Sequence, residues 1–230
     1  VFSLHFFRKN LVLLPSIASI DINFVFPLVR SGLKIFLVQI MFFLILASDR
    51  FIILKFLDSE TATSYDILYR LMTIVLFPFS IIAQPLWSSY AAAKANRDIE
   101  WIQLIIGRLY VFSVIILFCV LAMSLSFDFI TGIWLNSIFD ISFYSKIGVG
   151  LLLFLTMWST IHSDILFGIG AHKLMGICVL LGLGAKFVVL YSVKLGDNIN
   201  LESIILSSLF GYAVFAIAAP FFVKNLLQRI

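Results

Sequence analysis

The chain has 230 residues, of which 62% are hydrophobic and 12% are charged, with a formal net charge of +4. Soluble domains carry roughly 45–50% apolar and about 25% charged residues, so this composition excludes an ordinary soluble domain, a disordered tail and a secreted disulfide scaffold. It predicts an all-α integral membrane protein, whose positive charge belongs to cytoplasmic loops and not to a nucleic-acid interface.

The chain opens with an apolar stretch, residues 1–7, followed by Arg8 and Lys9. In a cleavable signal peptide the positive region would precede the apolar run, so we do not expect one. We expect residues 1–30 to be the end of a preceding span plus a cytoplasmic linker, which makes the sequence a partial one. Residues 31–230 are expected to form a six-helix membrane lobe.

Six stretches reach the length of about 20 apolar residues that a helix needs to cross a hydrocarbon core about 30 Å thick. They run over about 33–57, 67–93, 109–127, 147–169, 174–193 and 203–223. Pro78 and Pro85 lie inside the second stretch. Because prolines within spans are tolerated in lipid, they predict a bent helix, either statically kinked or moving.

Basic residues gather on one side of the predicted membrane. The flanks on that side hold Arg8, Lys9, Arg30, Lys34, Lys94, Arg97, Arg108, Lys173, Lys224 and Arg229, and the opposite flanks hold Lys55, Arg70, Lys146 and Lys194. The positive-inside rule therefore puts both ends of this chain in the cytoplasm. The connecting segments are too short for an extramembrane domain.

Enzyme motifs are missing from the sequence. It contains no P-loop, HExxH helix or metal-spaced Cys/His cluster, so we expect a transporter with no catalytic residues, metal or cofactor, and no ATP-driven pump. His162 and Asp164 are two residues apart and point to different helix faces. Trp158 and His162 are four apart, which predicts a packed aromatic–imidazole contact.

Ionisable residues inside spans are costly, so they are candidates for a functional site. Asp49, Arg50 and Arg70 lie in the outer half of their spans. Lys186 lies twelve residues into the fifth stretch, roughly 18 Å from the inner edge, and Asp164 lies toward the inner side. We expect a polar substrate cavity between helices, with net positive charge in its outer half, that could hold a diphosphate.

Two alternatives stay open for the outer charges. Arg50 and Arg70 are close enough to the outer surface to snorkel, and Asp49 could simply neutralise one of them. Polar Gln39, Tyr69 and Gln84 are further candidates for the wall of the same cavity.

Four motifs follow one another along the first two predicted spans. They are LVRSGLKIFL at 28–37, ASDRFIIL at 47–54, YDILYRL at 65–71 and QPLWSSYAAAKANRD at 84–98. In this order and spacing they resemble the carboxy-terminal half of O-antigen flippases, which are polysaccharide transporters of the multidrug/oligosaccharidyl-lipid/polysaccharide exporter superfamily. The resemblance runs from residue 28 to the end, and the later spans match mainly in length and hydropathy.

The resemblance implies that the chain forms one lobe of a two-lobe, twelve-helix exporter fold in the bacterial inner membrane. Such an exporter would flip undecaprenyl-diphosphate-linked oligosaccharide, an O-antigen or capsule repeat unit, by alternating access coupled to protons or sodium. Asp49, Arg50 and Arg70 match positions whose charges would accept the diphosphate-sugar, whereas Lys186 rests on its depth alone. The implied partners are this lipid-linked oligosaccharide, membrane lipid, a coupling ion and a missing first lobe.

Three other functions compete with flipping. Half of a cation-coupled multidrug antiporter would need acidic residues in the cavity, but basic residues outnumber acidic ones at mid-depth. A membrane glycan polymerase or acyltransferase would need a large outer loop or a convergent catalytic set. A non-catalytic scaffold would not need Asp49, Arg50 and Lys186 within its spans.

Overall fold

The computed structural model describes residues 21–136, 139–196 and 199–228, and every regular element among them is a helix. The expected end of a preceding span at residues 1–7 lies outside the described residues. The helices are α2 (Ile22–Phe56), α3 (Ser59–Ala83), α4 (Leu86–Ala95), α5 (Ile99–Trp134), α6 (Phe143–Gly168), α7 (His172–Leu195) and α8 (Leu201–Leu227).

The chain divides into two compact units, Val1–Phe36 and Leu37–Ile230. The described part of the first unit is the opening of α2, where the Asp21 carboxylate accepts the backbone N–H of Asn23 at 2.9 Å. The second unit holds the rest of α2 together with helices α3 to α8, and all the polar sites described below lie within it.

Polar residues between the apolar stretches determine where several helices begin. Asp58, Asp98, Ser142 and Asn200 each accept a backbone N–H from the first turn of α3, α5, α6 and α8, respectively. These side chains satisfy donors that have no partner within the helix. Gly170 closes the turn between α6 and α7 with a φ of +81°, a conformation that costs glycine little.

Six helical stretches among the described residues are long and apolar enough to cross a membrane, as the sequence predicts. They are Val25–Phe56, Ser59–Ala95, Ile99–Trp134, Phe143–Gly168, His172–Leu195 and Leu201–Leu227. The chain is thus an all-α, multi-pass membrane protein. Several helices extend beyond the predicted apolar stretches, because polar capping residues and not the ends of the apolar runs set where they begin.

The second predicted span is divided by its prolines. Pro78 lies inside α3, whereas α3 ends at Ala83 and α4 begins at Leu86, directly after Pro85. Proline has no backbone N–H to donate into the preceding turn, so the helical hydrogen-bond ladder is interrupted there. The expected bend therefore occurs as a break between two helices at Pro85.

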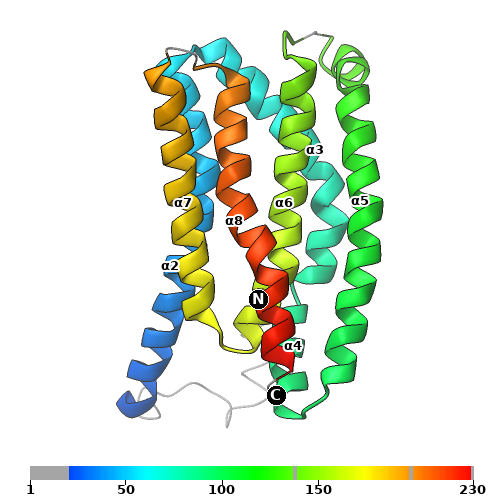
Figure 1. Ribbon diagram of the computed structural model, residues 1–230. Helices are drawn as coiled ribbons and strands as arrows, with labels where there is room; N and C mark the ends of the chain where they lie inside the picture. Colours follow the sequence, from blue (N-terminus) through cyan, green and yellow to red (C-terminus); the bar gives the residue numbers. More distant parts are fainter. Residues whose placement is uncertain (1–20, 137–138, 197–198, 229–230) are drawn as a thin grey trace, which may run out of the picture. The chain divides into compact units, whose positions relative to one another are not determined.

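Helices α6 and α8 form the centre of the second unit. In the most apolar 18 residues of each helix, 61% of the residues are buried in α6 and 50% in α8, against 22% in α5 and 28% in α7. In Figure 1, α8 lies between α7 and α6, and the contacts between helices give it the same two main neighbours. The apolar residues that remain exposed, such as Phe118, Phe129, Val188 and Phe221, make outer faces suited to lipid.

Candidate functional site

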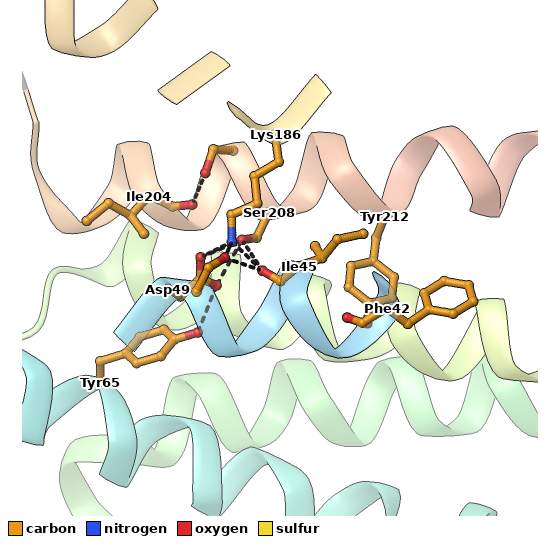
Figure 2. Close-up of polar contacts among 10 residues, drawn as sticks. Phe42, Ile45, Asp49, Tyr65, Lys186, Ile204, Ser208 and Tyr212 are labelled. Atoms are coloured by element: carbon orange, nitrogen blue, oxygen red, sulfur yellow. Dashed lines mark hydrogen bonds and ion pairs between the residues drawn. The ribbon is translucent and has the colours of Figure 1, made fainter. Parts of the chain in front are cut away.

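A buried ion pair joins α2 to α7 inside the membrane-spanning part of the second unit. The Lys186 ammonium lies 2.6 Å from Oδ1 of Asp49, and neither side chain has any exposed surface. Figure 2 shows the two side chains reaching toward each other from different helices. Charges placed at this depth are costly unless each is paired and hydrogen-bonded, so the surroundings of the pair decide whether it is tolerated.

Among the described residues, all the hydrogen-bond partners of the Lys186 ammonium lie on α2. Besides Asp49, Lys186 Nζ donates to Ser48 Oγ at 2.6 Å and to the backbone carbonyl of Ile45. A lysine ammonium has three donors, and three oxygens within one turn of α2 receive them. The position of Lys186 thus depends on the register of α7 against α2.

The carboxylate of Asp49 is held from two further helices. Ser208 of α8 lies 2.7 and 2.8 Å from the two carboxylate oxygens, and the Tyr65 hydroxyl of α3 donates to Oδ2 at 3.2 Å. Both of these partners are themselves buried. The group of Ile45, Ser48, Asp49, Tyr65, Lys186 and Ser208, called here the ion-pair network, therefore connects α2, α3, α7 and α8.

A glycine crossing brings α7 and α8 close enough to complete this network. A Cβ built on Gly182 would overlap the carbonyl oxygen of Gly211, so the two backbones can approach this closely only because both residues lack side chains. Gly182 lies one helical turn before Lys186, and Gly211 lies three residues after Ser208. The crossing thus sets the separation of the two side chains that flank Asp49.

A separate polar pocket of about 240 Å³ lies between α2, α6 and α8. The residues lining it are Gln39, Phe42, Thr156, Ser159, Thr160, Ser163, Asp164, Phe167 and Tyr212. One wall of the pocket is the face of α6 that carries the hydroxyl groups of Thr156, Ser159, Thr160 and Ser163. Figure 2 shows Phe42 and Tyr212 beside the ion-pair network, and the Tyr212 hydroxyl donates to the carbonyl of Phe42 at 3.2 Å.

The eight residues proposed from the sequence fall into three groups. Asp49 and Lys186 contact each other directly, and the pair has no access to solvent. Gln39 and Asp164 line the polar pocket between α2, α6 and α8. The remaining four residues, Arg50, Tyr69, Arg70 and Gln84, join neither group.

Those four lie on or near the surface of the second unit. Arg50 is 58% exposed and pairs with Asp66 of α3 at 3.3 Å, so the neighbour of Asp49 along the chain turns away from the buried network. Arg70 and Gln84 are also exposed, whereas Tyr69 is half-buried with its ring 6.1 Å from that of Tyr65. Asp49 therefore neutralises Lys186, and neither of the two arginines.

The sequence reasoning missed Ser48, Tyr65 and Ser208. No charge distinguishes these residues from other polar residues in apolar segments, although Ser208 stands near a glycine and Tyr65 opens one of the motifs quoted above. The predicted contact between Trp158 and His162 is confirmed, with ring centroids 5.0 Å apart. His162 also contacts Tyr110, whose hydroxyl lies 2.8 Å from Nε2.

No protein-family model, curated protein or solved structure matches the chain. Function is therefore inferred from the polar groups inside the membrane-spanning helices and from the motifs of the sequence.

Proposed function

We propose that the six-helix unit is one lobe of a transporter that flips a diphosphate-linked lipid oligosaccharide, an O-antigen or capsule repeat unit, across the bacterial inner membrane. The observation that carries the proposal is the fully buried pair of Asp49 and Lys186. Ionisable residues at membrane depth are retained mainly where substrates, ions or moving helices need them. A static scaffold could replace both by apolar residues at little cost.

The pair suits a protein that alternates between two conformations. Every acceptor of Lys186 in the described part of the chain lies on α2, so a movement of α2 away from α7 would break all three hydrogen bonds of the ammonium together. The diphosphate of a substrate is the kind of anion that could then replace the carboxylate of Asp49 as its partner. Asp49 has two further donors, Ser208 of α8 and Tyr65 of α3, that do not come from α7.

The exposed arginines fit the same substrate. Arg50 and Arg70 present guanidinium groups on the surface of the unit, at the depth where the sequence places the outer half of the spans. Arginine binds phosphate oxygens through two parallel N–H groups, which makes it suited to a diphosphate. In the proposed transporter these arginines face a second lobe, and both ends of the chain lie in the cytoplasm.

A second candidate function is half of a cation-coupled multidrug antiporter. One specific observation favours it, because the polar pocket contains a carboxylate, Asp164, to which no described residue donates a hydrogen bond or offers an ion pair. The motifs and the exposed arginines favour the flippase.

Complementation tests the proposal. The gene, together with any coding sequence that precedes it at its locus, is expressed in a strain that lacks its O-antigen flippase and carries the cognate oligosaccharide genes. Surface polysaccharide is then read on a gel, and protein levels are matched by immunoblot. We expect rescue by the unaltered protein and loss of rescue in Arg50→Ala and Lys186→Ala.

Lys194→Ala is the matched control, because Lys194 lies on the same helix as Lys186 but is exposed at the end of α7. It is expected to rescue fully. Failure of a well-expressed unaltered protein to restore polysaccharide would contradict flipping and favour the antiporter. Rescue by both Arg50→Ala and Lys186→Ala would show that transport does not require these basic residues.

A further inference from the structure

A second hollow, called here the rim pocket, lies between α6, α7 and α8, at the end of the unit where α7 ends and α8 begins (Figure 1). Its volume is about 430 Å³, within the range of about 300–1,000 Å³ that is typical of ligand sites. The residues lining it are Tyr144, Gly148, Val193, Asn200, Glu202, Ser203, Ile205, Leu206 and Leu209. None of them lines the polar pocket or belongs to the ion-pair network, so the rim pocket is a separate site.

The lining of the rim pocket changes from polar to apolar along the helices. Tyr144 stands in the first turn of α6, and Asn200 and Glu202 stand at the start of α8. Leu206 and Leu209 follow Glu202 by one and two turns, and α8 rises by about 14 Å from Asn200 to Leu209. The ends of spanning helices lie among lipid headgroups and their middles among acyl chains, so the pocket follows the polarity of the membrane. It therefore fits an amphipathic ligand that lies along α8 with its polar end at Glu202.

A carboxylate sets the charge at the polar end. Glu202 is the sole charged group among the lining residues, and no basic side chain in the described part of the chain forms an ion pair with it. The hydroxyls of Ser142 and Ser145 donate to this carboxylate. A carboxylate has about four lone-pair sites, so it can still accept hydrogen bonds from a ligand. The charge of Glu202 favours a ligand with a positive end and repels an anionic one.

We propose that the rim pocket binds one phospholipid with a primary ammonium headgroup, namely phosphatidylethanolamine. The ammonium lies on Glu202, and one acyl chain runs along Val193, Leu206 and Leu209. A primary ammonium carries three N–H donors and makes charge-assisted hydrogen bonds to a carboxylate. The quaternary ammonium of phosphatidylcholine has no such donor, and phosphatidylglycerol would place a net negative charge beside Glu202.

The bound lipid would join the two helices that complete the ion-pair network. Val193 follows Lys186 by two turns on α7, and Leu209 is the neighbour of Ser208 on α8. A lipid held between α7 and α8 therefore stabilises the helix pair that brings Lys186 and Ser208 to Asp49. The proposal goes beyond the proposed transport function, because lipid binding can be measured without any oligosaccharide.

Native mass spectrometry of the purified, delipidated full chain tests the site. Phosphatidylethanolamine, phosphatidylcholine and phosphatidylglycerol with identical acyl chains are added in turn, and the population that retains one lipid is measured against lipid concentration. We expect one saturable site that prefers phosphatidylethanolamine by at least about tenfold, as one hydrogen bond to a charged group would give.

Variants assign the preference to the rim pocket. Glu202→Gln keeps the shape of the side chain but removes its charge, so it should bind phosphatidylethanolamine and phosphatidylcholine equally. Its control is Glu60→Gln, because Glu60 is likewise acidic in the first turn of a helix, α3, but lies outside the pocket. This control should retain the full preference.

A second pair of variants tests the path of the acyl chain. Val193→Trp fills the apolar part of the pocket and should remove the saturable site for all three lipids. Leu195→Trp is its control, because Leu195 lies on the same helix but is 71% exposed and outside the pocket. It should bind as the unaltered protein does.

Equal retention of the three lipids by the unaltered protein would overturn the proposal, and so would an unchanged preference in Glu202→Gln. Both results can be read even if Val193→Trp fails to fold. Neither result would bear on complementation, so the lipid site and the transport function can fail independently.

Discussion

The energy of the buried pair can be measured with a double-mutant cycle on Asp49 and Lys186. Two unit charges 2.6 Å apart attract each other by about 6 kcal/mol at an effective dielectric constant of about 20, before the cost of removing them from water is subtracted. Removing one partner of a buried pair typically costs about 3–5 kcal/mol, because the other charge is left uncompensated. Asp49→Asn and Lys186→Met should each lower the free energy of unfolding by about 3–5 kcal/mol.

The double variant should recover most of that loss. An asparagine at position 49 still offers Ser208 and Tyr65 an oxygen acceptor, and its amide N–H groups replace donors lost with Lys186. A coupling energy of at least about 3 kcal/mol is therefore expected, since pairs replaced together are often close to neutral. For a chain of this size, each kcal/mol shifts the unfolding temperature by about 2–4 °C.

The assay is thermal unfolding of the purified chain in detergent, with the Arg50–Asp66 pair as the matched control. That pair also starts from α2, one residue after Asp49, but it reaches α3 and its side chains are 58% and 24% exposed, so a coupling below about 1 kcal/mol is expected. If the two single losses at Asp49 and Lys186 add to the double loss within about 0.5 kcal/mol, the two side chains do not interact as described, and the reasoning is refuted.

Three further predictions use the same unfolding measurement. Gly182→Ala should lower the free energy of unfolding by about 1–3 kcal/mol, because the added methyl group would overlap α8 at the helix crossing. Gly184→Ala should cause no such loss, because there is open space around its Cβ. Equal effects of the two variants would contradict the crossing. Ser208→Ala should lower the free energy of unfolding by about 1.5–3 kcal/mol, because the hydroxyl of Ser208 donates to a carboxylate. Ser207 is equally buried but donates within its own helix, so Ser207→Ala should lower it by about 1 kcal/mol or less. Hydrogen bonds from the first turn of α3 lower the pKa of the Asp58 carboxyl, so its contribution to stability is present above the unfolded pKa of about 3.9 and is lost as the pH falls through the folded value. Asp58→Ala should therefore unfold at a lower temperature than the unaltered protein at pH 7, with the difference narrowing below about pH 4; a constant difference would contradict this.

The number and order of the membrane spans followed from hydropathy, because a run of about 20 apolar residues has few alternatives to a transmembrane helix. Helix ends did not follow as well, since capping residues such as Asp98 and Ser142 lie outside the apolar runs that define the spans. The break at Pro85 was visible as a bend, but whether a proline kinks a helix or ends it depends on the packing around it.

The candidate site was visible only in part. Counting residues along helices placed Asp49 and Lys186 within the membrane, but their pairing joins positions 137 residues apart and depends on the Gly182–Gly211 crossing. Arg50, adjacent in sequence to Asp49, points about 100° away around the helix, which is why one residue is buried and its neighbour is exposed. Ser208 carried no signal, because a serine in an apolar span usually bonds to its own helix.

The ion-pair network also imposes an order on biosynthesis. Asp49 enters the membrane with α2, and Lys186 follows 137 residues later, a delay of about 7–27 s at about 5–20 residues per second. Tyr65, only 16 residues behind Asp49, is the first of its final donors to be synthesised. The nascent protein therefore holds a carboxylate without its lysine partner, with at most one tyrosine as donor, until α7 is made. Lys186 and Ser208 are synthesised 22 residues apart, so the charge is neutralised only as α7 and α8 assemble.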